Sequence, residues 1–203
     1  MQNTKRCVIK SMSLCFETIK VVEGQPLHVA YHNARCNKTR EELFTCKDHL
    51  DLSTFINAPD KAGVYRCRID YAKTIERVVF FPLLPRHFEH FRLKEINFEY
   101  AHKWSDRRAI DQAKEGSDAV IFHRNGYLLD TPIANIALAI DDVWITPKTP
   151  LLHGTTRARF LDEGWLKEGD LGIDALRYAK KFAIMNALID WQEIENFTLE
   201  ELN

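Results

Sequence analysis

Three short stretches in the second half of the chain decide the fold: DTPIANI over residues 130–136, WITP over residues 144–147 and LLHGTTR over residues 151–157. The first carries one acid, Asp130, on a segment of otherwise small and apolar residues that indicates a strand. The third opens a predicted helix, so backbone N–H groups and threonine hydroxyls lie together at a helix N-terminus, which favours a bound anion. In this order, the stretches predict an acidic strand followed by an anion-binding helix.

Lys103 lies just ahead of another helix, which is predicted over about Asp106–Glu115 with Ser105 or Asp106 as N-cap and Gly116 at its end. A lysine, an acid and an anion site are the groups that pyridoxal phosphate (PLP) requires. The amine must be uncharged to react with the cofactor aldehyde, the acid must keep the pyridine nitrogen protonated, and the helix must receive the phosphate. Each feature alone is also common without a cofactor, as a solvated lysine, a turn-capping acid or an ordinary helix start.

The remaining segments alternate strand and helix signals. The predicted elements are a hairpin of Leu14–Val22 and Leu27–Tyr31, surface-facing helices over Arg40–Phe44 and Lys47–Ile56, strands over Val64–Tyr71, Thr74–Leu84, Ala119–Phe122, Tyr127–Ile140 and Val143–Thr146, helices over Leu151–Leu161 and Ile173–Lys180, and a strand over Phe182–Leu188 before a charged tail. This order indicates an α/β or α+β fold with a mostly antiparallel or mixed sheet. No GxGxxG turn is present, which argues against a Rossmann unit. Periodicity fades between Arg86 and Tyr100, so we expect two domains, residues 1–100 and 101–203.

Composition excludes several classes of protein. The 203 residues carry a formal net charge of −1, which argues against a nucleic-acid binder. No apolar run approaches the ~18 residues of a membrane span. Residues 1–6 lack the apolar segment of a signal peptide, so we expect a cytoplasmic protein. The five cysteines are scattered without a CxxC pair and are expected to be idle thiols. His87 and His90 lie in a stretch without a clear period, and we expect no metal site.

The order of the motifs is similar to the signature of the class IV aminotransferases, the fold-type IV PLP family that includes branched-chain and D-amino-acid aminotransferases and aminodeoxychorismate lyase. Further matches flank the signature: FETI over residues 16–19, HNAR over residues 32–35, KWSDR over residues 103–107 and MNAL over residues 185–188. The KWSDR stretch resembles the Lys-x-x-Asn-Arg around the Schiff-base lysine of the lyase branch. The resemblance covers nearly the whole chain. It implies a small N-terminal α/β domain, a C-terminal mixed-sheet domain and a homodimer.

The resemblance also implies residue roles. Lys103 would form the Schiff base with PLP and then move the proton at the substrate α-carbon, while Asp130 would pair with the pyridine nitrogen. The other implied cofactor contacts are Arg35, Thr155 and Thr156 at the phosphate, and Asn186 and Ala187 near the phosphate or the edge of the cofactor. Asn135 would help to shape the cofactor strand. The chain departs from the family in having Asp130 where most members have Glu, and in a shorter stretch from Lys103 to the acid. Lys94 is an alternative lysine that restores the usual spacing but lacks the Asp-Arg that follows Lys103.

Arg66 and Arg68 are candidate substrate-binding residues that come from the pattern rather than from the resemblance. In a strand they share one face with each other and with Asp70. Two arginines on one face could hold a substrate carboxylate through paired N–H groups. A solvated sheet face is the alternative interpretation.

The reaction is less constrained than the cofactor, because one fold supports several reactions. The lysine context, the Asn-Ala-Leu near the end and the compact length look most like the lyase branch, which implies release of pyruvate from 4-amino-4-deoxychorismate to leave 4-aminobenzoate, a folate precursor. One alternative is an aminotransferase for a D- or branched-chain amino acid. Another is a binding protein that keeps the fold without catalysis. The expected partners are a small-molecule substrate and a second copy of the chain, with neither nucleic acid nor membrane.

Overall fold

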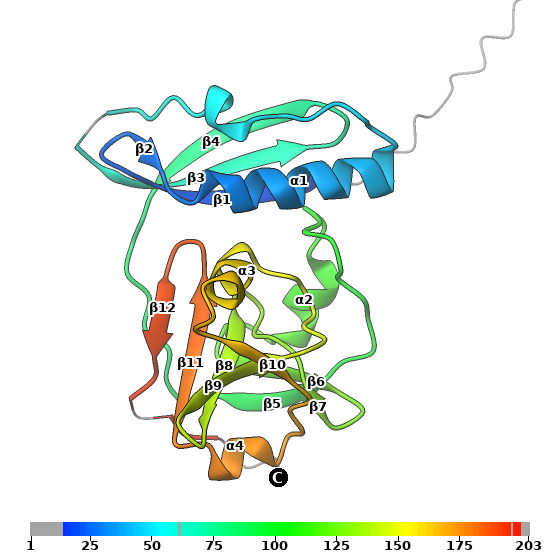
Figure 1. Ribbon diagram of the computed structural model, residues 1–203, viewed down its shortest axis with the longest axis vertical. Helices are drawn as coiled ribbons and strands as arrows, with labels where there is room; N and C mark the ends of the chain where they lie inside the picture. Colours follow the sequence, from blue (N-terminus) through cyan, green and yellow to red (C-terminus); the bar gives the residue numbers. More distant parts are fainter. Residues whose placement is uncertain (1–13, 61, 196, 200–203) are drawn as a thin grey trace, which may run out of the picture.

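The computed structural model describes residues 14–60, 62–195 and 197–199. The first half builds an antiparallel sheet in the order β2-β1-β3-β4, made of β1 (Cys15–Val22), β2 (Gln25–Pro26), β3 (Val64–Tyr71) and β4 (Ile75–Pro82). Helix α1 (Val29–Phe44) lies along this sheet (Figure 1). Apolar residues of β1 and β3 bury themselves against α1 and the short 3-10 helix η1 (Leu52–Phe55). Burial of this sheet face supplies the driving force for the first layer.

The second half builds two further sheets within the described residues. One has the order β5-β6-β7, with β5 (Arg92–Glu95), β6 (Val120–Arg124) and β7 (Tyr127–Leu128). The other has the order β10-β9-β8-β11-β12, with β8 (Asn135–Ile140), β9 (Val143–Pro147), β10 (Lys167–Gly169), β11 (Lys181–Asn186) and β12 (Asp190–Glu193). Helices α2 (Arg108–Ala113), α3 (Thr155–Asp162) and α4 (Ala175–Tyr178) complete it. Parallel and antiparallel pairs both occur, which confirms a mixed α/β fold.

The segment that carries Lys103 returns to the first sheet. The backbone N–H of Phe16 donates to the carbonyl of Lys103 over 2.9 Å, and Trp104 forms an isolated bridge with Cys15. The N–H of Ser105 donates to the carbonyl of Leu14 over 2.7 Å. Residues far apart in sequence are thereby held at one end of β1.

The extended segment predicted over Leu27–Tyr31 is wrong, because α1 begins at Val29. The turn at Glu23 and Gly24, both with positive φ, leads only into the two-residue β2. The buried positions of α1 are mostly polar or small, namely His32, Cys36, Thr39, Arg40 and Phe44. A helix with this stripe has a weak apolar period, so hydrophobic patterning misses it. The helix predicted over Arg40–Phe44 is confirmed as the end of α1, and Glu41 and Glu42 are exposed as expected, but Arg40 and Phe44 are buried.

The helix predicted over Lys47–Ile56 is present only as η1. Side chains of α1 take the backbone groups that a longer helix would use internally. The side-chain Oδ1 of Asn37 accepts from the backbone N–H of Leu50 over 2.8 Å, and the Oδ1 of Asn33 accepts from the backbone N–H of Leu52 over 2.9 Å. Because these bonds satisfy the loop backbone, the segment stays irregular despite its composition.

Other elements differ from the prediction in their bounds. The strand predicted over Tyr127–Ile140 is broken between β7 and β8, where Thr131 forms a turn with Ala134 and Pro132 lacks an N–H. The helices predicted over Leu151–Leu161 and Ile173–Lys180 begin later, at Thr155 and Ala175. Strands β5, β10 and β12 were not predicted, because short strands carry little period.

The predicted strands over Val64–Tyr71, Thr74–Leu84, Ala119–Phe122, Val143–Thr146 and Phe182–Leu188 are confirmed as β3, β4, β6, β9 and β11, with shifts of one or two residues at most ends. The helix predicted over Asp106–Glu115 is confirmed in the shorter form α2, whose N-cap position is Arg107. Asp106 still accepts from the N–H of Arg108 over 3.1 Å.

The division into residues 1–100 and 101–203 stays a prediction. Strand β5 precedes residue 100 and pairs with β6, so it shares a sheet with later residues. Cys15, Cys36 and Cys67 are buried free thiols, and burial raises the pKa of each to about 12. None of the helices in the described ranges has the length and apolar character to span a bilayer. Residues 1–6, on which the expected localisation rests, lie outside the described residues.

Candidate active site

Lys103 is half-buried beside the ring of Phe16. Its Nζ lies 4.8 Å from the ring centroid, and the guanidinium of Arg68 lies 4.0 Å from the same centroid. Desolvation lowers the pKa of Lys103 to about 7, and the positive charges of Arg35, Arg107 and Arg68 act in the same direction. The carboxylate of Glu17 opposes this shift. A substantial share of this amine is therefore uncharged near neutral pH, as a nucleophile or base requires.

Glu17, on β1, is fully buried and binds two residues of α1. Its Oε1 accepts from Arg35 Nε over 2.8 Å, and its Oε2 accepts from Arg35 Nη2 over 2.6 Å. The Nδ1 of His32 lies 2.6 Å from Oε2. Burial opposes ionisation of Glu17, but Arg35 and His32 hold its pKa at about 2. The pKa of His32 is lowered, first by burial. Glu17 is thus a carboxylate that accepts from a neutral imidazole and a guanidinium.

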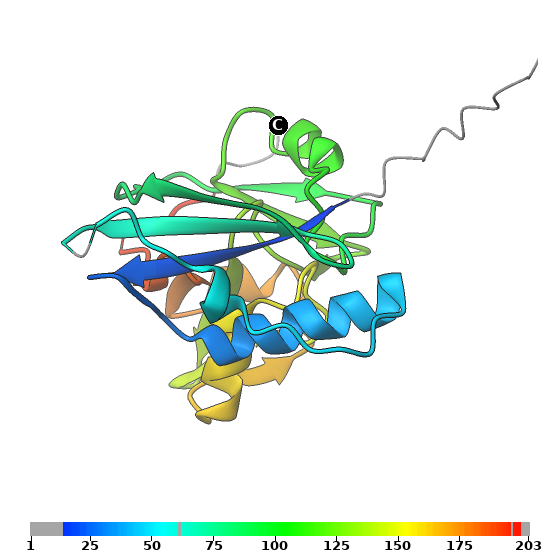
Figure 2. The same cartoon turned by 90° about the horizontal axis from the view of Figure 1, so that it is seen from above.

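Arg35 connects this cluster to the start of α3. Its Nη1 donates to the carbonyl of His153 over 3.2 Å. His153 precedes Gly154, the N-cap of α3, which makes no side-chain cap bond. Thr155 and Thr156 follow and are buried. Both views place α3 against α1 (Figure 2). The uncapped N–H groups of α3, its dipole and a guanidinium thus meet in one place, which favours an anion.

Asp130 is buried at the break between β7 and β8. Its Oδ1 accepts from the Nδ2 of Asn135 over 2.7 Å, and its Oδ2 accepts from the N–H of Leu152 over 2.8 Å. The same Asn135 amide donates to the carbonyl of Leu152 over 2.8 Å. Desolvation raises the pKa of Asp130 to about 7, although these hydrogen bonds lower it. A cationic or N–H partner would therefore stabilise the ionised form of Asp130, since burial penalises an isolated charge.

The turn after Asp130 is held from two sides. The Nη2 of Arg107 donates to the carbonyl of Pro132 over 2.7 Å. The Nδ2 of Asn186, at the end of β11, donates to the carbonyl of Ile133 over 3.0 Å. Asn186 therefore lies at the turn that carries Asp130, and Ala187 follows it in the turn before β12. The KWSDR and MNAL stretches thus converge on the acidic strand.

Arg66 and Arg68 lie on one face of β3, as predicted. Arg68 pairs with Asp70 over 2.7 Å and donates to the Ser105 hydroxyl over 3.1 Å. The guanidinium of Arg66 lies 4.4 Å from the centroid of the Phe81 ring. Desolvation, together with the nearby charges of other arginines, lowers the pKa of Arg66. Arg66 has no carboxylate partner among the described residues, so it is the arginine of this face most suited to an external anion.

Lys94 has a different environment. It lies on β5, and its Nζ pairs with Glu115 over 2.6 Å. Its side chain is 41% exposed. The structure thus gives Lys94 the contacts of a surface lysine.

Three residues next to Lys103 received no role from sequence reasoning, namely Glu17, His32 and Arg107. Each lies inside a matching stretch, within FETI, HNAR or KWSDR. The stretches were therefore the available signal, but their roles depend on contacts between segments that sequence alone does not reveal. Arg35 reaches the loop before α3 through His153, Asp130 and Asn135 reach it through Leu152, and Asn186 holds the turn after Asp130.

These side chains fit PLP chemically. Lys103 offers an amine of lowered pKa, Asp130 a buried acid, and the start of α3 with Arg35 a phosphate site. These residues could hold the aldehyde, pyridine nitrogen and phosphate ends, respectively.

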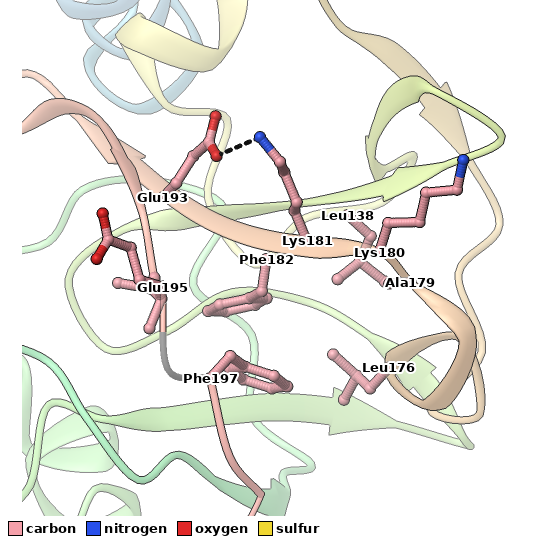
Figure 3. A pocket seen from close by; sticks show the side chains of 10 residues that line it. Leu138, Leu176, Ala179, Lys180, Lys181, Phe182, Glu193, Glu195 and Phe197 are labelled. Carbon is pink, nitrogen blue, oxygen red and sulfur yellow. Dashed lines mark hydrogen bonds and ion pairs between the residues drawn. The ribbon is translucent and has the colours of Figure 1, made fainter.

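A separate pocket of about 540 Å³ lies beside β11, β12 and α4 (Figure 3). Leu176, Phe182 and Phe197 line it, and the ion pair of Lys181 and Glu193 closes one side over 2.8 Å. Its lining includes none of the predicted site residues. Across the described ranges, no group of three or more His, Cys, Asp or Glu side chains forms a metal-binding cluster.

Known proteins show the same fold and sequence pattern. A protein of Haemophilus influenzae, described only as uncharacterized, is 28% identical over 85% of this chain and 96% of its own length. A structure from Haemophilus somnus, described as a "putative 4-amino-4-deoxychorismate lyase", is 28% identical, with a TM-score of 0.77 over 87% of this chain and 96% of that chain. The PLP-bound form of a hypothetical aminotransferase from Mycobacterium tuberculosis has a TM-score of 0.72 at 18% identity, over 92% of this chain and 82% of that chain.

The fold is that of the fold-type IV aminotransferase structures. The sequence matches the family "Amino-transferase class IV" over residues 76–197, which is more than half of the chain and includes both Lys103 and the DTPIANI stretch. The chain therefore belongs to the class IV aminotransferase family, whose members are PLP-dependent aminotransferases and lyases.

Proposed function

We propose that the chain is a PLP-dependent 4-amino-4-deoxychorismate lyase that releases pyruvate and leaves 4-aminobenzoate. The environment of Lys103 carries the proposal: its amine lies beside Phe16 and Arg68, and desolvation with three nearby arginines lowers its pKa to about 7, so a substantial share is uncharged near neutral pH. The similarity to the Haemophilus somnus protein over nearly its full length supports the lyase branch. The contacts of Lys94 with Glu115 favour Lys103 as the reactive lysine.

Each cofactor-facing residue has a role in this proposal. When bound, PLP withdraws electrons from the substrate bonds that break. Lys103 would hold the cofactor aldehyde until the substrate amine takes its place, and its freed amine would then take the proton at the substrate α-carbon and give it back as the pyruvate-forming group leaves. Asp130 hydrogen-bonds the pyridine nitrogen, and Asn135 orients Asp130. Arg35, Thr155 and Thr156 hold the phosphate, with Asn186 supporting the adjacent turn and Ala187 beside it.

Arg66 and Arg68 supply the substrate contact. Arg68 lies over Phe16, the ring that also contacts Lys103, so this face of β3 adjoins the reactive amine. Arg68 is largely neutralised by Asp70, whereas Arg66 keeps its charge available. Arg66 would bind a carboxylate of the substrate, and Arg68 would contribute its remaining N–H groups. The same pair would also hold the α-carboxylate of an amino acid, which is the observation in favour of an aminotransferase.

We also propose a homodimer acting in the cytoplasm. The homodimer follows from the family resemblance, whereas the location is the expectation drawn from residues 1–6. The oligomeric state is measured directly by light scattering of the purified protein.

The first experiment is an absorbance spectrum of purified protein with PLP, followed by borohydride reduction and mass mapping. We expect a new band between the near-ultraviolet and the visible, with the label on Lys103. The Lys103→Ala variant should lose both the absorbance band and the label, while Lys94→Gln should keep the band and the label on Lys103. A label on Lys94 would contradict the assignment. No band in any sample would leave a fold without this chemistry.

The reaction is tested next by product. Incubation with 4-amino-4-deoxychorismate should release pyruvate and 4-aminobenzoate in equal amounts. If instead D- or branched-chain amino acids convert the bound cofactor to its amine form, and pyruvate is not released, the protein is an aminotransferase.

A further inference from the structure

Both oxygens of the Glu17 carboxylate are bound by side chains of α1. The carboxylate receives hydrogen bonds from Arg35 Nε and Nη2 and from the ring of His32, all between 2.6 and 2.8 Å. An ionised carboxylate only accepts, so the Nδ1 of His32 carries the hydrogen. The carboxylate is completely shielded from solvent. Such an arrangement holds the guanidinium in one plane through two parallel N–H bonds.

The hydrogen bonds of Arg35 leave part of its capacity unused. A guanidinium has five N–H groups. Within the described residues, two of them donate to Glu17 and one donates to the carbonyl of His153. Two remain, one on Nη1 and one on Nη2. Because Nη1 lies 3.2 Å from the carbonyl oxygen of His153, the guanidinium lies beside the start of α3, where Gly154 makes no side-chain cap bond.

We propose that Glu17 is a positioning residue for phosphate recognition: with His32 behind it, Glu17 fixes Arg35 so that its two unused N–H groups and the start of α3 form one receptor for a phosphate ester. This inference rests on the proposed PLP function and adds a residue to it. Glu17 never touches the phosphate. It acts only through the orientation of Arg35.

The charges at this position explain why a carboxylate behind Arg35 helps rather than hinders. A negative charge near a phosphate weakens the attraction, but this one is compensated by a bidentate arginine in a buried environment. Without Glu17, Arg35 would lose two of its three bonds, and its side chain would have to be ordered when the phosphate arrives. Ordering a flexible side chain at the moment of binding lowers affinity, and pre-organisation removes that cost.

A purely structural role for Glu17 makes a different prediction. If Glu17 only stabilises the packing of α1 on β1, its loss should weaken every ligand of the site alike. If it positions Arg35, its loss should weaken ligands that carry a phosphate and spare those that do not. PLP and pyridoxal differ by that phosphate alone and therefore separate the two roles.

The test is the dissociation constant of PLP and of pyridoxal, measured by absorbance titration of full-length wild type, Glu17→Gln, Arg35→Gln and the double variant. We expect Glu17→Gln to weaken PLP binding roughly 10- to 100-fold, by analogy with the loss found when a residue that supports a metal ligand is removed. Pyridoxal should change by less than about threefold, since the lost contact acts on the phosphate. In the Arg35→Gln background, Glu17→Gln should have no further effect on the ratio of the two dissociation constants, called the PLP-to-pyridoxal ratio, because the two residues act as one unit.

Two further variants serve as controls. Glu42→Gln removes an exposed carboxylate from the same helix and should leave both constants unchanged. Glu17→Asp keeps the charge, so its PLP-to-pyridoxal ratio should lie between those of Glu17→Gln and the wild type. The inference would be overturned if Glu17→Gln weakened the binding of both ligands equally or weakened neither, since the ratio would then be unchanged. If Glu17→Gln does not fold, the same criterion applies to Glu17→Asp and to His32→Gln, each expected to lose part of the ratio.

Failure of this inference is distinguishable from failure of the proposed function. Wild-type protein that binds PLP more tightly than pyridoxal, with Glu17→Gln keeping that preference, would sink only the role of Glu17. Wild-type protein that shows no preference for PLP would overturn both.

Discussion

The side-chain amide of Asn135 donates a 2.7 Å hydrogen bond to the carboxylate of Asp130, and both side chains are buried. Asn135 also binds the carbonyl of Leu152, whose N–H donates to the other oxygen of Asp130. The acid is therefore fixed to the loop that leads into α3. In the proposed enzyme, this closed set of bonds fixes the distance between the pyridine-nitrogen partner and the phosphate site.

Gly154 is the position where this arrangement tolerates least change. A Cβ at residue 154 would lie 1.9 Å from Oδ1 of Asn135. Gly154→Ala should therefore displace Asn135, leave buried polar groups unpaired, and lower the free energy of unfolding by about 2–4 kcal/mol. Gly172→Ala is the matched control, because its nearest neighbour would be 3.8 Å away. Urea denaturation of both variants checks the difference, and equal stability would contradict the packing described.

The raised pKa of Asp130 predicts a pH dependence of the cofactor-free protein. Burial raises this pKa from 3.8 to about 7, so the folded state keeps a proton that the unfolded state releases between those values. The contribution of Asp130 to stability is thus fully present at low pH and is lost as the pH rises toward 7. Asp130→Asn has no such proton. Urea denaturation between pH 4 and pH 7 should show the variant gaining stability relative to wild type as the pH rises, and a constant difference would contradict the raised pKa.

The lowered pKa of Lys103 predicts unusual reactivity. Its amine, with a pKa of about 7, should be mostly uncharged at pH 8, where an ordinary lysine near 10.5 stays protonated. Brief labelling of cofactor-free protein with an amine-specific reagent across pH 5–11, read by mass mapping, should give Lys103 a midpoint near 7. Lys94 serves as the internal control within the same sample. If both lysines titrate together, Lys103 is not desolvated in solution.

Arg66 and Arg77 provide a matched pair for the substrate contact. Arg66 has no carboxylate partner among the described residues, whereas Arg77 is exposed and bound to Asp70 over 2.8 Å. Arg66→Gln should raise KM for a carboxylate substrate about 10- to 100-fold, the effect of losing a charge-assisted bond, with kcat less affected. Arg77→Gln should stay within about twofold of wild type, because Arg77 itself is exposed and Asp70 keeps its pair with Arg68. Steady-state kinetics of both variants decide the assignment, and similar KM values would refute it.

Much of the fold could be predicted where the sequence has a strong local pattern. Strands β4 and β11 have runs of apolar residues and β3 alternates apolar with charged residues, and the predicted bounds of all three are close to those observed. Helix α1 could not be predicted as a whole because its buried side includes His32 and Arg40, whose burial depends on partners elsewhere in the chain. The loop after α1 is predicted as a helix but is irregular, because two of its backbone N–H groups donate to the side chains of Asn33 and Asn37. Such long-range hydrogen bonds have no local signature.

The sequence by itself determined the chemistry available to this protein: the motif order identified the family, and the residue types supplied an amine, an acid and an anion-binding helix start. Only the tertiary structure decided their environments. The bond from Phe16 to Lys103 and the pairing of Glu17 with Arg35 join segments that are distant in the chain. A pKa depends on desolvation and on neighbouring charges, and both are properties of packing rather than of residue order. That is why Lys103 and Lys94 are similar candidates in the sequence and differ in the folded protein.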